Sequence, residues 1–152
     1  MQIRPGGLDD PRVLTLLRDH LAAAREITPP CSVHALDETG LKASGIDFWA
    51  AWEDADLLGI GALRQIAPDH GEIKSMHVEK SRRRSGTGSA MLRHIIAAAR
   101  DKGMLRLSLE TGATAYFHAA RALYRSHGFS ECPPFGDYSP DCHSVFMTLA
   151  LG

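Results

Sequence analysis

The chain has 152 residues, of which 44% are hydrophobic and 23% are charged, and this composition predicts one globular domain over residues 1–152. Its 17 basic and 18 acidic side chains give a net charge of −1, which argues against disorder and against a general attraction to nucleic acids or membranes. No apolar run approaches the length of a membrane span, and no signal peptide opens the sequence. We therefore expect a cytoplasmic protein with neither a nucleic-acid nor a membrane partner.

Cysteine and histidine residues do not stand at metal-binding spacings. The three cysteines, Cys31, Cys132 and Cys142, are odd in number and form no paired motif, which predicts free thiols. None of the eight histidines has a second histidine four residues away, on the same face of a helix. We therefore expect no metal site.

The first half of the chain predicts an amphipathic helix and a hairpin. Residues 2–4 are extended, and Asp10 and Pro11 are typical of a helix N-cap and a first helical position. The helix should end before Pro29. Its inner face repeats at helical spacing and consists of Val13, Leu16, Leu17, His20, Leu21 and Ala24. A weaker helix is predicted over 36–43, and strands over 47–52 and 57–63.

The second half predicts three strands and two helices. In the first strand, over 72–78, strict alternation puts Ile73, Ser75 and His77 on one side and Lys74, Met76 and Val78 on the other. Helices are predicted over 85–100 and around 119–124, and strands over 105–110 and 144–149. The order predicts an α/β (α+β) fold, a mixed central sheet flanked by helices, with strands 72–78 and 105–110 parallel neighbours.

A basic, glycine-containing loop joins strand 72–78 to the helix over 85–100. It begins with Arg82 and reads RRRSGTGS as far as Ser89. Unpaired backbone N–H groups and the positive end of a helix dipole make such a position an anion site. The loop lacks the lysine of a Walker loop, and Met91 stands where a dinucleotide fingerprint needs a third glycine. A phosphate-bearing ligand is predicted, with a solvated charged turn as the alternative.

Two segments carry a resemblance to a known family. The sequence RRSGTG, from Arg83 to Gly88, fits R-x-x-G-x-G and resembles the pyrophosphate loop of the GCN5-related N-acetyltransferase (GNAT) superfamily. The sequence ARALYRSHGF, from Ala120 to Phe129, is similar to the family's A-x-x-L-Y-x-x-x-G-F segment. The predicted element order also matches that of the family. One departure is Phe117, where the family often has a cofactor-contacting asparagine.

The resemblance implies a cofactor site in the middle of the sheet. The sheet would be splayed between strands 72–78 and 105–110, with acetyl-CoA as cosubstrate in the gap and without a metal. Pantetheine would pair along strand 72–78, and the pyrophosphate would bind to the glycine loop. The implied cofactor-binding residues are Met76, His77, Val78, Arg83, Arg84, Ser85, Gly86, Thr87, Gly88, Ser89, Phe117 and Ala120. Family members often pair, so a homodimer is a further expectation.

Acyl transfer to an amine needs a neutral nucleophile, a donor for the oxyanion and a proton for the leaving thiolate. Tyr124 matches the family's tyrosine beside the sulfur, which makes it the candidate acid. Glu72 stands where some members have a catalytic glutamate and is the first candidate base, with Glu110 and His77 as alternatives. The backbone N–H of residue 76 or 77 is the candidate oxyanion donor.

The acceptor site is expected on loops, where Ser32, His34 and Tyr138 are the candidates. The expected function is an N-acetyltransferase that uses a primary amine of a small molecule or amino acid, by direct attack in a ternary complex. A protein lysine or N-terminus is the alternative acceptor. Two other functions are a non-catalytic acyl-CoA sensor, which Phe117 favours, and a nucleic-acid module using the arginines, which the net charge disfavours.

Overall fold

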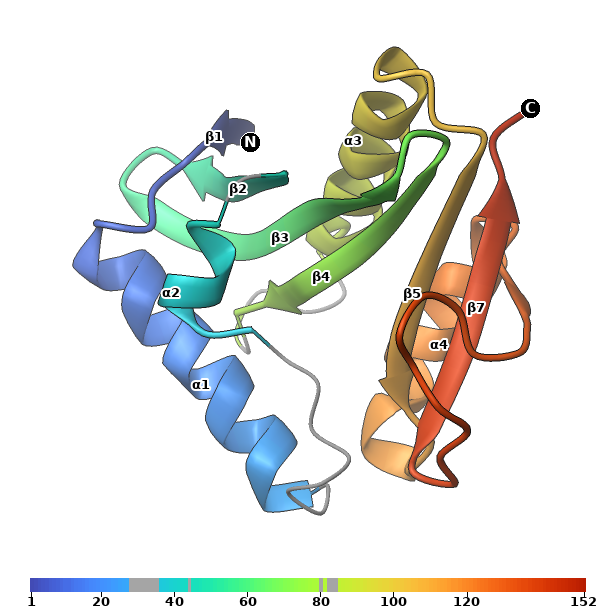
Figure 1. Ribbon diagram of the computed structural model, residues 1–152. Coiled ribbons are helices and arrows are strands. Elements are labelled where there is room, and N and C mark those ends of the chain that lie inside the picture. The colour runs from blue at the N-terminus through green and yellow to red at the C-terminus, as the bar shows by residue number, and fades with distance from the viewer. Residues whose placement is uncertain (28–35, 44, 80, 82–84) are drawn as a thin grey trace.

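The computed structural model describes residues 1–27, 36–43, 45–79, 81 and 85–152. In these residues seven strands form one mixed sheet in the order β1-β2-β3-β4-β5-β7-β6 (Figure 1). The elements are β1 Gln2–Pro5, α1 Pro11–Ile27, α2 Glu38–Leu41, β2 Ile46–Glu53, β3 Asp56–Ala67, β4 His70–Val78, α3 Thr87–Asp101, β5 Arg106–Gly112, the 3-10 helix η3 Ala115–Phe117, α4 His118–Ser126, β6 Ser130–Glu131 and β7 Ser144–Ala150. The predicted mixed sheet with flanking helices is confirmed.

Helices cover both faces of the sheet. On one face α1 and α2 pack against β2 and β3, through an apolar cluster that includes Val13, Leu17 and Phe48. On the other face α3 and α4 pack through a second cluster, which includes Met91 and Ile95. Residues 48–52 are all buried, because alternate side chains of β2 enter one cluster and then the other.

The predicted start of the first helix is confirmed at its cap. The backbone N–H of Arg12 donates to Oδ1 of Asp10 at 2.9 Å, which satisfies one of the free donors at the start of α1.

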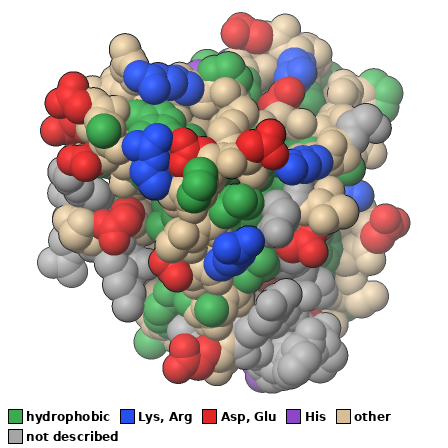
Figure 2. All heavy atoms as spheres, turned by 90° about the vertical axis from the view of Figure 1, so that its left-hand side faces the viewer, with side chains coloured by type: hydrophobic (Ala, Val, Ile, Leu, Met, Phe, Trp, Pro, Cys, Tyr) green, Lys and Arg blue, Asp and Glu red, His purple; other side chains and the backbone are tan. Residues whose placement is uncertain are grey.

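None of the helices in the described ranges is long and apolar enough to span a membrane. Figure 2, which shows the face at the left of Figure 1, has positive and negative side chains interspersed.

The splay between β4 and β5 is also confirmed. The two strands pair in parallel only from His70 with Arg106 to Ile73 with Leu109. Beyond that point β4 stays paired with β3, and β5 continues with β7 as its antiparallel partner to Gly112. The second half of β4 therefore has no partner strand on its β5 side among the described residues, and the two strands diverge in Figure 1.

The strict alternation predicted for strand 72–78 is wrong after Lys74. Lys74 pairs with Ala62 and His77 pairs with Ile60, so β4 advances three residues where β3 advances two. The extra residue forms a β-bulge. Ser75 lies in it with a φ of 53°, a left-handed conformation that is rare for residues other than glycine. As a result His77 faces α1, on the same side as Lys74, while Met76 packs against the cluster under α3.

Candidate active site

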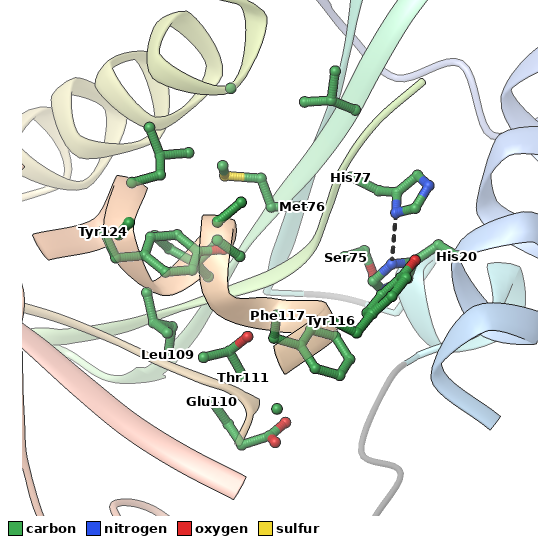
Figure 3. Close-up of a pocket in the computed structure, with 18 of the residues that line it drawn as sticks. His20, Ser75, Met76, His77, Leu109, Glu110, Thr111, Tyr116, Phe117 and Tyr124 are labelled. Carbon is green, nitrogen blue, oxygen red and sulfur yellow. Dashed lines mark hydrogen bonds between the residues drawn. The ribbon is translucent and has the colours of Figure 1, made fainter. Parts of the chain in front are cut away.

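The splay opens a cavity of about 790 Å³ between the two halves of the sheet. Its walls come from the second half of β4, the end of β5, η3 with α4, the N-terminus of α3, and the inner face of α1 (Figure 3). Because the strands part here, the edge of β4 from Lys74 to Val78 faces the cavity instead of another strand. An extended ligand can therefore form backbone hydrogen bonds to this edge as an added strand would.

The N-terminus of α3 forms one end of the cavity. Gly86 precedes the helix with a φ of 87°, which glycine adopts without strain, and Gly86, Gly88 and Ser89 line the cavity. The backbone N–H groups of the first helical turn have no partner within the helix, so this end favours an anion. Arg83 and Arg84, the predicted basic residues of this loop, lie outside the described residues. Ser85 and Thr87 belong to the loop and helix start but do not line the cavity.

Tyr124 on α4 reaches the cavity from the side of β5. Its ring is buried and meets Phe129 at a centroid distance of 5.8 Å. Within the described part of the chain, no hydrogen bond is made by its hydroxyl. Burial raises the pKa of this hydroxyl well above its ordinary value, and the nearby Glu110 carboxylate raises it further. The phenol is therefore neutral at physiological pH and is a hydrogen-bond donor.

Phe117 contributes an aromatic wall where the family often has an asparagine. A side chain at Gly112 would collide with its ring, so the ring of Phe117 lies directly against the backbone of Gly112 at the end of β5. Tyr116 meets the same ring edge-on at a centroid distance of 4.9 Å, and Ala120 lines the wall next to it. This position offers apolar contact to a ligand instead of a side-chain amide.

Glu72, the first predicted base, lies in a buried polar network. Its carboxylate accepts the hydroxyl of Tyr138 at 2.5 Å, lies 3.5 Å from Nζ of Lys74 and is 4.0 Å from Arg64. Lys74 also donates to the Tyr138 hydroxyl at 2.9 Å. The Glu72 side chain is 2% exposed, and of this network only Lys74 lines the cavity. Burial and the Glu72 charge raise the pKa of Tyr138, so the tyrosine remains a donor.

Two histidines meet at the α1 side of the cavity. The Nδ1 atoms of His20 and His77 are 3.2 Å apart, and their rings cross at 63° with a centroid distance of 5.0 Å (Figure 3). Burial lowers the pKa of His20 to about 3, and positive charge on His77 and Lys74 lowers it in the same direction. His20 is therefore neutral in the folded protein.

This buried histidine predicts a loss of stability in mild acid. The unfolded chain binds a proton at His20 below about pH 6.5 while the folded chain does not until about pH 3, so stability falls as pH drops through this window. Between pH 7 and pH 5 this effect should lower the free energy of unfolding by about 2 kcal/mol. Urea unfolding at both pH values should show this loss, and His20→Asn should reduce it. Equal losses in both proteins would contradict the assignment.

A group of possible metal ligands lies away from the cavity, in the loop before β7. One ligand atom from each of Asp141, Cys142 and His143 lies within 4.8 Å of the others. The carboxylate of Asp141 already accepts the backbone N–H of His143 at 2.8 Å, so a local turn accounts for this arrangement.

The structure brings together most of the predicted cofactor residues. Those that line the cavity are Met76, His77, Val78, Gly86, Gly88, Ser89, Phe117 and Ala120, together with Tyr124. Of the predicted acceptor residues, Tyr138 lies on the buried network, while Ser32 and His34 lie outside the described residues. Sequence analysis missed the roles of His20, Lys74 and Ser75 as lining residues. For His20, the sequence did offer one indication of a buried position, because His20 stands on the apolar face of the first helix.

Comparisons of the sequence with a family model and with known proteins agree on one family. Residues 14–129 match the Acetyltransferase (GNAT) family. The chain is 46% identical to the uncharacterized N-acetyltransferase YsnE of Bacillus subtilis (strain 168), over 99% of this chain and 100% of that protein. It is 44% identical to the uncharacterized N-acetyltransferase YedL of Escherichia coli (strain K12), over 98% and 94%. An IAA acetyltransferase of Azospirillum brasilense is 37% identical over 83% and 82% of the two chains.

Solved structures share the fold. A Klebsiella pneumoniae protein assigned as an acyl-CoA N-acyltransferase superposes with a TM-score of 0.80 at 26% identity, over 99% of this chain and 97% of that one. A GNAT family acetyltransferase from Elizabethkingia anophelis with acetyl-CoA bound gives a TM-score of 0.72 at 19% identity, over 98% and 97%. Family match, close relatives and fold agree, and the chain therefore belongs to the GNAT family of N-acetyltransferases.

Proposed function

We propose that the protein transfers an acetyl group from acetyl-CoA to a primary amine of a small molecule or amino acid, by direct attack within a ternary complex. The observation that carries this proposal is the cavity in the splay. It combines a strand edge that has no partner strand among the described residues, a helix N-terminus suited to an anion and a buried neutral tyrosine within one space of about 790 Å³.

Each part of acetyl-CoA has a matching wall in this cavity. The amides of a pantetheine arm match the edge of β4, and the pyrophosphate matches the N-terminus of α3. Phe117 and Ala120 offer apolar contact, which suits the pantetheine arm. The structural neighbour from Elizabethkingia anophelis, which has acetyl-CoA bound, supports this choice of donor.

The chemistry needs a proton donor and an oxyanion site beside the thioester. Tyr124 supplies a neutral hydroxyl that can protonate the leaving thiolate. The backbone N–H of Met76 or His77, which follow the bulge, is the proposed oxyanion donor. The three candidate bases differ in access: Glu110 and His77 line the cavity, whereas Glu72 is buried in the network with Tyr138 and Lys74.

A small acceptor is favoured by one relative whose name gives its substrate. The IAA acetyltransferase of Azospirillum brasilense matches over most of both chains, at 37% identity. A peptide N-terminus or a lysine side chain is the alternative acceptor and belongs in the same assay. Release of free CoA from acetyl-CoA should be followed with a thiol reagent, against amino acids, polyamines, aromatic amines and an unstructured peptide. Thermal stabilisation by CoA without release on any amine would support a sensor instead.

Acetyl-CoA and CoA should stabilise the protein, whereas ATP and NAD should not. A ligand at 100 times its Kd adds about 2.7 kcal/mol, which raises the melting temperature of a domain of this size by about 5 to 10 °C. Ser89→Asp places a negative charge in the first turn of α3, where it favours the helix but repels a pyrophosphate. This variant should keep its melting temperature and lose the shift with CoA.

The matched control is Ala97→Asp, which adds the same charge at an exposed position further along α3 and should keep the shift. If neither CoA nor acetyl-CoA shifts the melting temperature of the unmodified protein, the proposed cofactor site is wrong.

A further inference from the structure

The pair of histidines at the α1 side of the cavity exists because of the bulge in β4. An unbroken strand would turn His77 toward α3, together with Ile73. The extra residue at Ser75 turns it toward α1 instead, where its Nδ1 atom meets Nδ1 of His20 at 3.2 Å. Ser75 retains a left-handed φ of 53°, and its buried hydroxyl has no hydrogen-bond partner within the described residues. Unfavourable local backbone geometry of this kind concentrates at functional sites.

The contact between the two Nδ1 atoms limits how the pair can carry protons. One nitrogen must donate and the other must accept, because two N–H groups or two lone pairs would repel each other. When His77 takes up a proton, both of its nitrogens carry hydrogen. Neutral His20 must then present the lone pair of its Nδ1 atom to the N–H of His77. The protonated pair therefore has one arrangement, in which protons enter and leave at Nε2 of His77.

Of the candidate bases His77 and Glu72, only His77 lines the cavity. Both histidines line the cavity, whereas Glu72 does not and already accepts from Tyr138. The groups that face the cavity beside His77 are His20 of α1, Lys74 of β4, Glu110 of β5, Tyr116 of η3 and Tyr124 of α4. On the β3 side, the apolar Ile60 lies opposite His77 in the sheet. Among these groups, His20 contacts the ring of His77 and meets its Nδ1 atom at 3.2 Å, and this contact orients the imidazole.

We infer that His77 is the general base that takes the proton from the acceptor amine, and that His20 is a positioning residue that keeps the lone pair of His77 on Nε2. This inference rests on the proposed acetyl transfer. The amine nitrogen forms a bond to the thioester carbon, and the carbon–sulfur bond breaks. The ammonium proton goes to Nε2 of His77, and the thiolate takes a proton from Tyr124. Solvent then returns the proton of His77 to Tyr124, which regenerates both groups.

Long-range ¹H–¹⁵N spectra of the imidazole nitrogens test the arrangement without any substrate. With His77→Gln and His20→Asn used for assignment, we expect His77 to carry its proton on Nδ1 and His20 to carry its proton on Nε2 at pH 8. The result that would overturn the inference is a proton on Nε2 of His77 at that pH. Because this experiment needs neither acetyl-CoA nor an amine, its outcome is independent of the proposed function.

Steady-state kinetics test the roles of His77 as the base and His20 as the positioning residue. The substrates are acetyl-CoA and the amine that is most active in the thiol-release screen. His77→Gln should lower kcat/KM by about 100-fold and remove the acid limb of its pH profile. His20→Leu should lower kcat by about tenfold with little change in the Kd of acetyl-CoA, since the base is then misoriented. His20→Asn, whose carbonyl oxygen can replace the Nδ1 acceptor, should recover most of this loss. A merely structural role would not produce such rescue.

The matched control is His94→Gln, on α3 beside Trp49 and away from the cavity, which should leave the pH profile unchanged. Glu72→Gln provides the contrary test. If it removes the acid limb while His77→Gln retains it, the base is Glu72 and the inference is wrong. Melting temperatures of all variants separate these effects from loss of the fold.

Discussion

Tyr124→Phe should lower kcat by about 100-fold and leave the Kd of acetyl-CoA nearly unchanged. The change removes one hydroxyl, which faces the cavity and has no hydrogen-bond partner within the described residues, so the thiolate loses its proton donor. The ring stays in place because its contact with Phe129 does not involve the hydroxyl. Stopped-flow or steady-state release of CoA gives kcat, and isothermal titration gives the Kd.

The pH dependence adds a second readout for Tyr124. Because burial raises the pKa of this hydroxyl, the unmodified enzyme should show no loss of kcat from tyrosine ionisation up to about pH 9. Tyr116→Phe is the matched control, since Tyr116 also lines the cavity but is exposed, on η3. If Tyr124→Phe keeps the kcat of the unmodified enzyme, the tyrosine only packs against Phe129 and the thiolate is protonated by water.

The fold could be predicted from the sequence wherever one local pattern decides an element. Met91, Leu92 and Ile95 repeat at helical spacing, and α3 buries them as predicted. Alternation in residues 105–110 likewise indicated β5, and the order of the elements indicated a mixed sheet, whose splay was implied by the resemblance to the GNAT superfamily. Such patterns are local because helix and strand periodicity is set by the backbone itself.

The bulge in β4 shows where local patterns stop being sufficient. Ser75 is not a residue type that favours a left-handed φ, and the extra residue is visible only against the register of β3. Strict alternation therefore placed His77 on the wrong face, away from His20. The two-residue strand β6 and the 3-10 helix before α4 were missed for the opposite reason, since they are too short to have a period.

Contacts between segments that are far apart in the chain also could not be predicted from the sequence. Tyr138 was predicted at an acceptor loop and Glu72 at a strand end, but 66 residues separate them, and nothing in either segment indicates that the hydroxyl of one donates to the carboxylate of the other. Nothing in the sequence indicated that the Glu72 side chain is buried, as it is in the structure. Whether Glu72 also serves as a base remains a prediction that the kinetics above test.

Glu72→Gln should lower the free energy of unfolding by about 3 to 5 kcal/mol, because it leaves the ammonium group of Lys74 buried without its carboxylate. For a domain of this size the melting temperature should fall by about 6 to 20 °C. Both side chains are less than a tenth exposed, so water replaces little of the lost interaction. Urea unfolding at pH 7.5 measures the change.

The double variant Glu72→Gln with Lys74→Met separates the ion pair from simple packing. It removes both buried charges, and neutral replacements of a buried pair are often tolerated, so it should recover most of the stability lost in the single variant. The cycle of single and double variants gives the coupling energy directly. A control at the exposed pair of Lys42 and Asp9, where Lys42→Met should cost less than about 1 kcal/mol, shows what an ion pair contributes in water.

Two outcomes of this cycle bear on the active site. If Glu72→Gln is as stable as the unmodified protein, water enters the network, and Glu72 has the access that a base needs. If instead the coupling is large, the Glu72 carboxylate is committed to holding Lys74 and Tyr138 in place at the edge of the cavity. Its replacement should then impair acetyl transfer through the position of Lys74, while the acid limb of the pH profile remains with His77.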